Sequence, residues 1–403
     1  MDIHQSASTS FTLPEEIQQY KDVARRIVRD ELMPLEQEYL ASKNTAYGLM
    51  AIDNLKSAFG QERAQRLIDI SRESGLWYIL VDEAHGGLGL PLLAKVAIEE
   101  EFEYCAVPFP FANVPNILYE CKGDQIDRYL TPIIEGQKTY CFAQAEPNAG
   151  SDPGGMMQTK AWKEGDEWVI SGIKMWISNA HESDVVMVQA VTDPDKRQRG
   201  GITMFVMDRH TPGIEIHEGG LPTWIDNGRH AQYLVNFNNV RVTEENILGE
   251  VGKGFNLGQK WLTIHDRLLR GPYALGKMQR ALDMSIDWAK QRTTFGQLIA
   301  ERQAIQWKLV DMNVDIQALR AMTYSIAARA DAGEDVRNEA ALVKLVSGDW
   351  GARTLDNAIQ IHGAMGEALE LPLTKFYRLL RHAQIGGGTS EIQRMLIARS
   401  LLK

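Results

Sequence analysis

Cysteine is scarce in this chain, and the cysteines that it has are far apart. Cys105, Cys121 and Cys141 are the only ones in 403 residues. An odd number without close spacing suggests neither a disulfide framework nor a zinc knuckle. We therefore expect a protein of a reducing compartment, and we predict no metal site.

Targeting segments are also missing. The N-terminus has neither the basic start and apolar run of a secretory signal nor the Arg-rich amphipathic pattern of a mitochondrial presequence. No stretch reaches the roughly 20 apolar residues that a helix needs to cross a bilayer. The sequence therefore predicts a cytoplasmic protein with no membrane span.

A surplus of basic residues is absent as well. The chain has 53 acidic and 43 basic residues, a formal net charge of -10, whereas nucleic-acid binding requires a basic surface. We therefore expect no nucleic-acid partner. The hydrophobic content of 44% and charged content of 24% are ordinary for a globular protein, and the length predicts two or three packed modules.

The period of the hydrophobic residues divides the chain into three parts. It is helical up to about residue 140, extended to about 245, and helical again from about 254. The extended runs are 168–170, 185–191, 202–207, 214–216 and 233–242. We predict an α+β fold: an N-terminal helical domain at 1–140, a middle antiparallel β-barrel or sandwich domain at 141–253, and a C-terminal four-helix bundle at 254–403.

One long helix of the C-terminal part can be read directly. Its apolar residues recur at steps of four and three, which places them on one buried stripe. They are Ile305, Leu309, Met312, Ile316 and Leu319. Gly333 follows the pattern and is predicted to end this helix.

Two segments of the middle part suit a bound ligand. Segment 141–152 ends a strand in a loop of small residues, whose backbone amides can approach a planar or anionic ligand; a plain β-turn is the alternative. In segment 174–179, strand alternation places the ring of Trp176 and the hydroxyl of Ser178 on one side. The alternative is a core tryptophan beside a surface serine.

Two further segments lie in the C-terminal part. In segment 291–296, Arg292 could make paired hydrogen bonds to a pyrophosphate, which a lysine could not reproduce. A solvated ion pair is the alternative for Arg292. Gln303 follows seven residues after this segment, and segment 360–366 adds the amide of Gln360 and glycines that permit close backbone approach.

In this order, around a helical–β–helical plan, these segments resemble the acyl-CoA dehydrogenase family. The resemblance runs from about residue 14 to 400 and includes segments 86–89, 239–242 and 388–394. It implies FAD-dependent dehydrogenation of an acyl-CoA thioester, between its α and β carbons, to the trans-2-enoyl-CoA. It also implies that an electron-transfer flavoprotein takes the electrons, and that the chain forms a homotetramer built as a dimer of dimers.

The resemblance also assigns residues to the cofactor. Trp176 and Ser178 match residues that pack on the flavin ring and hydrogen-bond it, and Ser151 also lies along the thioester. The residues from Arg292 to Ala364 would reach the adenosine-pyrophosphate arm of a FAD held mainly by a neighbouring subunit. The full set is Phe142, Gln144, Ala145, Ser151, Trp176, Ser178, Arg292, Phe295, Gln303, Gln360, Gly363, Ala364, Thr389 and Glu391.

Two positions depart from the family pattern. The family commonly has threonine where this chain has Ala145, and an unpaired flavin oxygen there would cost about 1–3 kcal/mol unless water or a backbone amide replaces the hydroxyl. Many members place a catalytic glutamate where this chain has Gly387. Glycine cannot accept the α proton, so another side chain must be the base.

An isovaleryl-CoA dehydrogenase-like branch of the family supplies its base from an earlier helix, and the matching residue here is Asp266. Aspartate is one methylene, about 1.5 Å, shorter than glutamate. The alternative for Asp266 is an ion pair with Arg270, and His265 is the second candidate base. Arg267 matches a residue near the CoA moiety, with a surface charge as the alternative. The backbone N–H of Gly387 is predicted to bind the thioester oxygen.

Three questions about activity stay open. The glycines at 386 and 387 remove bulk, which favours a branched or otherwise wide acyl group. A flavin oxidase on the same fold would reduce oxygen directly instead of an electron-transfer flavoprotein. A non-catalytic subunit of a heteromeric dehydrogenase would explain the missing glutamate at Gly387.

Overall fold

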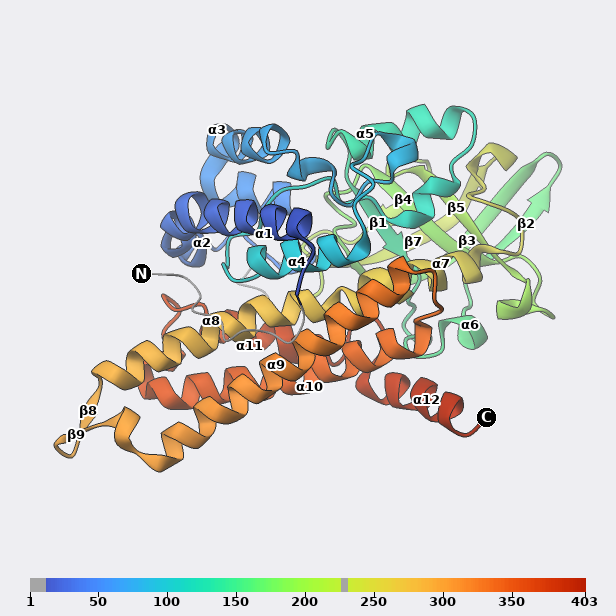
Figure 1. Ribbon diagram of the computed structural model, residues 1–403. Coiled ribbons are helices and arrows are strands. Elements are labelled where there is room, and N and C mark those ends of the chain that lie inside the picture. The colour runs from blue at the N-terminus through green and yellow to red at the C-terminus, as the bar shows by residue number, and fades with distance from the viewer. Residues whose placement is uncertain (1–11, 226–230) are drawn as a thin grey trace.

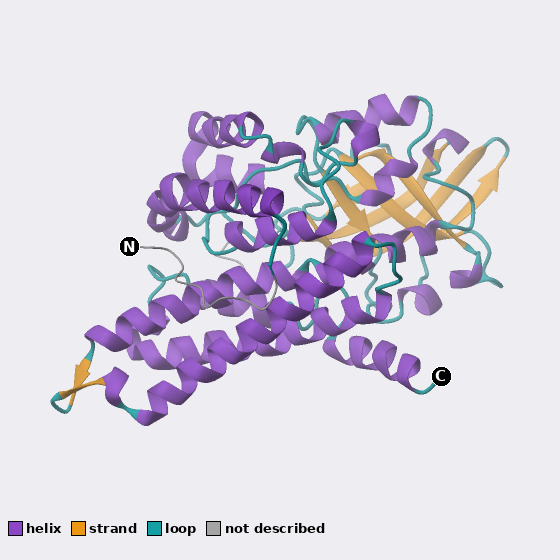
Figure 2. Ribbon diagram, viewed as in Figure 1, coloured by secondary structure: helices purple, strands orange, loops and turns teal. Residues whose placement is uncertain are grey.

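Three parts make up the fold (Figure 1). The computed structural model describes residues 12–225 and 231–403, apart from the side chain of His265. N-terminal helices and a sheet lie side by side above a layer of long C-terminal helices, and the strands of the sheet gather in one region (Figure 2). Among the described helices, none is both long and apolar enough to cross a membrane.

The N-terminal part is helical, as predicted. Its helices are α1 (Glu15–Ile27), α2 (Glu36–Ala41), α3 (Ala51–Glu73), α4 (Leu92–Phe102) and α5 (Thr131–Ile134), with a π-helical turn η1 (Val28–Leu32) after α1. Residues are buried on nearly every side of α4, and its contacts with α1, α8 and α9 explain why. This helix therefore joins the N-terminal part to the C-terminal bundle.

The middle part is a seven-stranded curled sheet with a short helix, α6 (Pro153–Met156). Its strands are β1 (Tyr140–Ala143), β2 (Lys160–Glu164), β3 (Glu167–Ser178), β4 (Val185–Val191), β5 (Ile202–Asp208), β6 (Ile214–Ile216) and β7 (Gln232–Val242). Each predicted extended run lies in a strand. The predicted antiparallel barrel or sandwich needs one correction: the sheet is mixed, because β4 pairs in parallel with β1 and β2. The chain between β1 and β4 includes α6 and the β2–β3 hairpin, long enough for a parallel return.

The C-terminal part is a bundle of long helices. They are α7 (Gly254–Thr263), the π-helical turn η9 (Ile264–Leu268), α8 (Arg270–Gln291), α9 (Gln303–Asp331), α10 (Arg337–His362), α11 (Leu373–His382) and α12 (Ser390–Leu401). The predicted stripe lies on α9, with Met312, Ile316 and Leu319 fully buried. Helix α9 ends before Gly333, whose φ of 82° confirms the predicted stop. A hairpin, β8 (Thr293–Thr294) and β9 (Gln297–Leu298), stands at the far end of the bundle (Figure 2).

Buried charges lock α1, α4 and α9 together. Arg320 Nε donates to Glu100 Oε1 at 2.8 Å, and the Tyr324 hydroxyl donates to Glu100 Oε2 at 2.6 Å. Lys21 Nζ donates to the Tyr324 hydroxyl at 2.9 Å. Burial opposes the charged form of Glu100, but Arg320 and Lys21 outweigh it and lower its pKa to about 2.

Removing one partner from this network should be costly. Arg320→Met leaves the Glu100 carboxylate buried without its guanidinium, so we expect the free energy of unfolding to fall by roughly 3–5 kcal/mol. Arg337→Met, which breaks an exposed ion pair with Asp335, should cost less than about 1 kcal/mol. Urea unfolding of both variants checks this, and equal losses would contradict it.

Candidate active site

A buried ion pair fixes the loop after β1 against β3. Lys174 Nζ donates to Glu146 Oε1 at 2.9 Å and to the carbonyl of Gln144 at 3.1 Å, and both charged side chains are almost fully buried. Glu146 also accepts the backbone N–H of Gln158 at 2.6 Å and of Thr159 at 3.0 Å. Burial lowers the pKa of Lys174 to about 8 despite this carboxylate. The loop is therefore held from two sides.

Trp176 lies beside this loop on a strained backbone. Its φ is 64°, which is unusual for a bulky residue, and its side chain is 52% exposed. A β-bulge between Lys174 and Ile177 breaks the strict alternation that the sequence predicted. Trp176 is therefore not a core tryptophan. Ser178 is half-buried, and a Cβ at Gly48 would lie 3.0 Å from its Oγ.

The remaining predicted residues of this segment differ in what they contact. Phe142 packs edge-on against Trp261, with ring centroids 5.1 Å apart. Gln144 Nε2 donates to Gln189 Oε1 at 2.8 Å. The carbonyl of Ala145 accepts the Met175 N–H at 2.9 Å, while its own N–H has no partner within the described chain. Ser151 is exposed.

Asp266 lies on the π-helical turn η9, between α7 and α8. Such turns recur at functional sites. The carboxylate fills the space in which a side chain at position 387 would stand: a Cβ on Gly387 would be 2.9 Å from Asp266 Cβ, 3.0 Å from its Cγ and 3.2 Å from its Oδ2. The structure thus brings together the two residues for which the sequence predicted catalytic roles, although they are 121 positions apart.

A glycine turn carries Gly387. Gly387 and Gly388 have φ values of 69° and 93°, which favour glycine, and the N–H of Gly387 has no partner among the described residues. Thr389 then caps α12, since its Oγ1 accepts the Ile392 N–H at 3.4 Å. Glu391 lies exposed in the first turn of α12.

The space expected beside the two glycines is already filled. Asp266 occupies the position next to Gly387, and a Cβ on Gly386 would lie 2.7 Å from His382 Nε2. The interpretation of these glycines as vacated bulk was therefore wrong. Their missing side chains make room for other residues of this chain rather than for an acyl group.

The buried side chain of Lys344 stabilises the glycine turn. It is 1% exposed, and its Nζ donates to the carbonyls of Ala383 at 2.7 Å and Gly388 at 2.5 Å. Burial, followed by the charge of Arg270, lowers its pKa to about 8. The sequence analysis missed Lys344. A lone charge in the apolar run 340–346 was the signal that could have identified it.

Arg270 binds one of the two carboxylate oxygens of Asp266. Its Nη2 donates to Oδ1 at 2.6 Å, so the ion pair considered as the alternative for Asp266 is present. Oδ2 remains on the Gly387 side. Arg267 is half-buried, its Nε lacks a partner within the described chain, and burial lowers its pKa. The surface-charge alternative for Arg267 was therefore wrong. The side chain of His265, the second candidate base, lies outside the described residues.

Three titratable side chains near Asp266 or its partner Arg270 stay uncharged near neutral pH. Burial, followed by the charge of Arg270, lowers the pKa of His382 to about 4. Burial raises the pKa of Tyr140, and Asp266 raises it further. Burial also raises the pKa of Glu99 on α4 to about 8, with Glu103 adding to the effect. No sequence pattern pointed to Glu99, because its burial results from the packing of α4 against other helices.

The other predicted cofactor residues lie at the opposite end of the bundle. Phe295, in the β8–β9 hairpin, has a φ of 52° and is 99% exposed. Arg292, Gln303, Gln360, Gly363 and Ala364 are exposed too. Trp288, near the end of α8, stacks on His362 at the end of α10, which brings these segments together. Helix α8 separates this group from Asp266 by about 33 Å, the length of its 22 residues.

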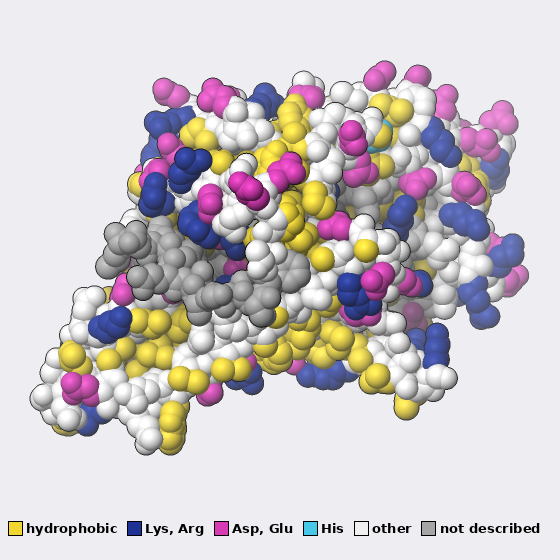
Figure 3. All heavy atoms as spheres, viewed as in Figure 1, with side chains coloured by type: hydrophobic (Ala, Val, Ile, Leu, Met, Phe, Trp, Pro, Cys, Tyr) yellow, Lys and Arg dark blue, Asp and Glu magenta, His cyan; other side chains and the backbone are white. Residues whose placement is uncertain are grey.

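An apolar surface lies on the outer face of the bundle, where Figure 3 shows hydrophobic side chains gathered along the C-terminal helices. Trp307, Val310 and Val314 of α9 and Leu342 of α10 are exposed. Contiguous apolar surface of this kind marks an interaction site.

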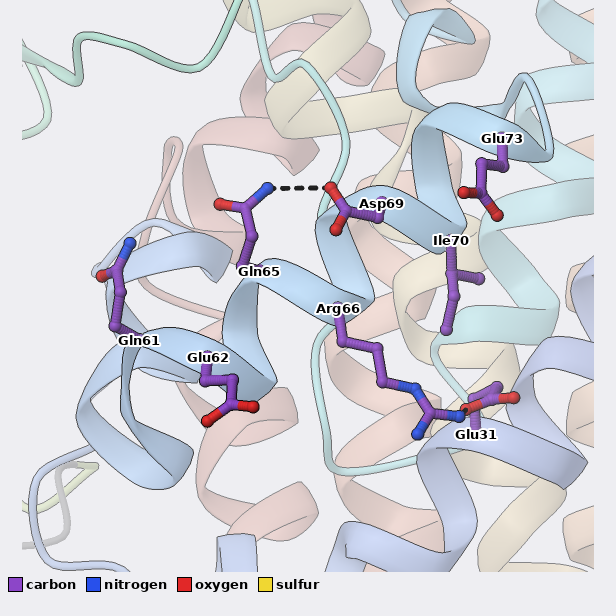
Figure 4. A pocket seen from close by; sticks show the side chains of 8 residues that line it. All are labelled: Glu31, Gln61, Glu62, Gln65, Arg66, Asp69, Ile70 and Glu73. Carbon is purple, nitrogen blue, oxygen red and sulfur yellow. Dashed lines mark hydrogen bonds and ion pairs between the residues drawn. The ribbon is translucent and has the colours of Figure 1, made fainter.

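A separate open groove of about 800 Å³ lies on the N-terminal helices (Figure 4). Its lining residues are Glu31, Gln61, Glu62, Gln65, Arg66, Asp69, Ile70 and Glu73. They belong to η1 and α3, and none is a predicted site residue. Its carboxylates would repel a phosphate-bearing ligand. We therefore assign no ligand to this groove.

Known families match all three parts of the chain. The model described as acyl-CoA dehydrogenase, N-terminal domain, matches residues 14–137, the middle-domain model matches 141–240, and the C-terminal-domain model matches 252–402.

Individual relatives cover nearly the whole chain. (R)-benzylsuccinyl-CoA dehydrogenase of Thauera aromatica is 34% identical, over 97% of this chain and 97% of its own length. Short-chain specific acyl-CoA dehydrogenase, mitochondrial, of Mus musculus is 33% identical, over 98% of this chain and 92% of its own. The solved structure of butyryl-CoA dehydrogenase from Megasphaera elsdenii covers 98% of this chain and 100% of its own, with a TM-score of 0.81 at 28% identity.

The raised pKa of Glu99 predicts a pH dependence of stability. The folded state keeps this proton up to about pH 8, whereas an ordinary glutamate loses it near 4.5. The stability that Glu99 contributes is therefore lost as pH rises from about 4.5 to 8. Glu99→Gln cannot titrate and should remove this part of the slope, as measured by unfolding at several pH values.

Glu164→Gln is the control of opposite sign. Hydrogen bonds from Trp162 and Arg241 lower the pKa of Glu164, so its contribution is lost as pH falls. If the unfolding slope of Glu99→Gln between pH 4.5 and 8 matched that of the wild type, the burial assigned to Glu99 would be wrong.

Proposed function

Because the chain belongs to the acyl-CoA dehydrogenase family and is a FAD-dependent acyl-CoA dehydrogenase, we propose that Asp266 is its catalytic base and that Gly387 binds the thioester oxygen. The observation that carries this proposal is that the Asp266 side chain fills the space beside Gly387, 2.9–3.2 Å from where a Cβ at that position would stand. The N–H of Gly387 then binds the oxygen of the thioester carbonyl, and Asp266 removes the proton of the adjacent α carbon.

The loop after β1 and the end of β3 fit the flavin ring. Trp176 offers an exposed aromatic face on a strained backbone, and the free N–H of the adjacent Ala145 can replace the threonine hydroxyl that this chain lacks. Ser178 and Ser151 add hydroxyl donors. When bound, FAD accepts the hydride that leaves the β carbon of the substrate.

Asp266 and Gly387 divide the work on the thioester. The N–H of Gly387 donates to the thioester oxygen, where negative charge develops as the α proton leaves. Oδ2 of Asp266 accepts that proton, since Oδ1 is held by Arg270. We assign Arg267, half-buried next to Asp266, to the CoA moiety. This division supports a catalytic subunit over a non-catalytic one.

The acyl group is proposed to be wide. The support comes from a relative of this chain and not from the glycines at 386 and 387. One relative of nearly equal length acts, by its name, on a benzylsuccinyl thioester, which bears a ring. A ring-bearing or branched acyl group is therefore the proposed substrate class, with an electron-transfer flavoprotein as the proposed acceptor. The family resemblance alone supports that acceptor.

The assembly is proposed to be a homotetramer in which a neighbouring subunit completes each cofactor site. Helix α8, about 33 Å long, separates Asp266 from the group of predicted FAD residues that includes Arg292 and Phe295. The exposed Phe295 and the apolar surface of α9 would be covered in such an assembly.

Asp266→Asn tests the base. The amide keeps the shape of the side chain but cannot accept the α proton, so FAD should stay bound while flavin reduction by a thioester slows by roughly 10²–10⁴-fold. Anaerobic stopped-flow absorbance measures this rate. Asp287→Asn, an exposed aspartate of the same helical run, is the control. A near-normal rate in Asp266→Asn would eliminate Asp266 as the base.

Phe295→Ser tests the shared cofactor site. Because Phe295 contributes nothing to the core of one chain, the fold should survive while flavin absorbance per subunit falls and sedimentation shifts toward smaller assemblies. Leu88→Ser, at an exposed leucine of the N-terminal part, should change neither quantity. Full flavin content in a Phe295→Ser tetramer would exclude this role.

A further inference from the structure

The ion pair between Arg270 and Asp266 works against the proposed base. Arg270 Nη2 donates to Asp266 Oδ1 at 2.6 Å, so a proton can reach that oxygen only after the guanidinium moves away. Only 16% of the Arg270 side chain and 20% of the Asp266 side chain are exposed, so water screens the pair weakly. A substrate group that draws the guanidinium from Oδ1 would therefore make both carboxylate oxygens available to the α proton.

Arg270 has donors to spare. A guanidinium carries five N–H groups, and within the described chain only Nη2 has a hydrogen-bond partner. Nε is buried and without a partner. A second carboxylate could therefore bind Arg270 in a bidentate way and compete with Asp266 Oδ1.

The surroundings of Arg270 favour an added negative charge. Several packed elements contribute: Lys277 and Tyr273 on α8, Glu99 on α4 and Glu103 just after it, Tyr47 before α3, His382 on α11 and Lys344 on α10. Glu103 pairs with Lys277, while Glu99 keeps its proton and His382 is neutral at pH 7. Among the described residues, the cations Arg270, Lys277 and Lys344 thus face the carboxylates Asp266 and Glu103, and both Asp349 and Arg267 also lie near Lys344.

A cationic or wholly apolar acyl group fits these surroundings less well. A cation would meet three positive groups at close range. An apolar group would leave the buried donors of Arg270 unpaired, which is unfavourable in a protein interior. A carboxylate satisfies the donors and the charge together.

Building on the proposed function, we propose that Arg270 binds a carboxylate carried by the acyl group, so that the substrate is a monothioester of a dicarboxylic acid. The carboxylate must lie close to the reacting carbons, because Arg270 touches the residue that removes the α proton. Binding draws the guanidinium from Asp266 Oδ1 and frees that oxygen beside Oδ2 as an acceptor of the α proton. The gain therefore appears in the rate of flavin reduction as well as in affinity.

Matched thioesters test this directly on the holoenzyme. The probes are the CoA monothioesters of succinic and glutaric acid and the same thioesters with a carboxamide in place of the free carboxylate. Wild-type flavin should be reduced roughly 10- to 100-fold faster by each acid than by its amide, the range expected for hydrogen bonds to a charged group. Equal rates for acid and amide would overturn the proposal.

Arg270→Gln should abolish the preference. Its rates with acid and amide should agree within about twofold, whatever its overall rate of flavin reduction. Arg280→Gln, which changes another partly buried arginine of α8 paired with Glu36, should keep the full preference. Arg270→Lys, which keeps the charge but loses the fork, should retain only part of it.

A binding measurement separates this proposal from the proposed function. Dissociation constants of acid and amide, read from the flavin spectrum, do not require turnover. Tighter binding of the acid to wild type but not to Arg270→Gln supports the carboxylate site even if no thioester is oxidised. In that case the dehydrogenase proposal for Asp266 fails alone. Oxidation of the amides as fast as the acids, with equal affinity, leaves the dehydrogenase intact and rejects the site.

Discussion

Charge buried away from water needs a partner, and this requirement organises the whole active-site region. Lys174 is held by Glu146, Lys344 by two backbone carbonyls, and Asp266 by Arg270. Glu146 lies 28 positions from Lys174, and the two carbonyls lie 39 and 44 positions from Lys344, whereas Arg270 is one helical turn from Asp266. The loop after β1 and the glycine turn before α12 are therefore held by contacts between distant segments, and the π-helical turn before α8 by a local ion pair.

These paired charges have different roles within the site. Lys174 and Lys344 donate to backbone carbonyls of the loops that they hold. Asp266 has one oxygen bound by Arg270 and the other on the side of Gly387. A rigid scaffold thus carries one carboxylate whose availability depends on its neighbour. The strained Trp176 belongs to the same scheme, because the pinned segment of β3 holds its positive φ.

The sequence predicted the helical–β–helical plan, the strand positions and the stop of α9 at Gly333, because these follow from local period and turn chemistry. It predicted the meeting of Asp266 and Gly387 only through resemblance, since nothing local relates positions so far apart. Three features were beyond it. The parallel pairing of β4 depends on how the chain returns, the bulge at Trp176 on contacts with β7, and the filling of the space at Gly386 by His382 on the packing of α11.

A side chain at position 387 and the side chain of Asp266 cannot occupy the same space, and this has an evolutionary consequence. Any L-residue at 387 would place its Cβ 2.9 Å from Asp266 Cβ, on a backbone whose φ of 69° already disfavours it. A lineage that moved its catalytic carboxylate from position 387 to position 266 could not gain Asp266 before it lost the side chain at position 387. The order of substitutions is therefore constrained, because the side chain at one position must become smaller before a larger one is tolerated at the other. Asp266 now disfavours any side chain larger than glycine at position 387.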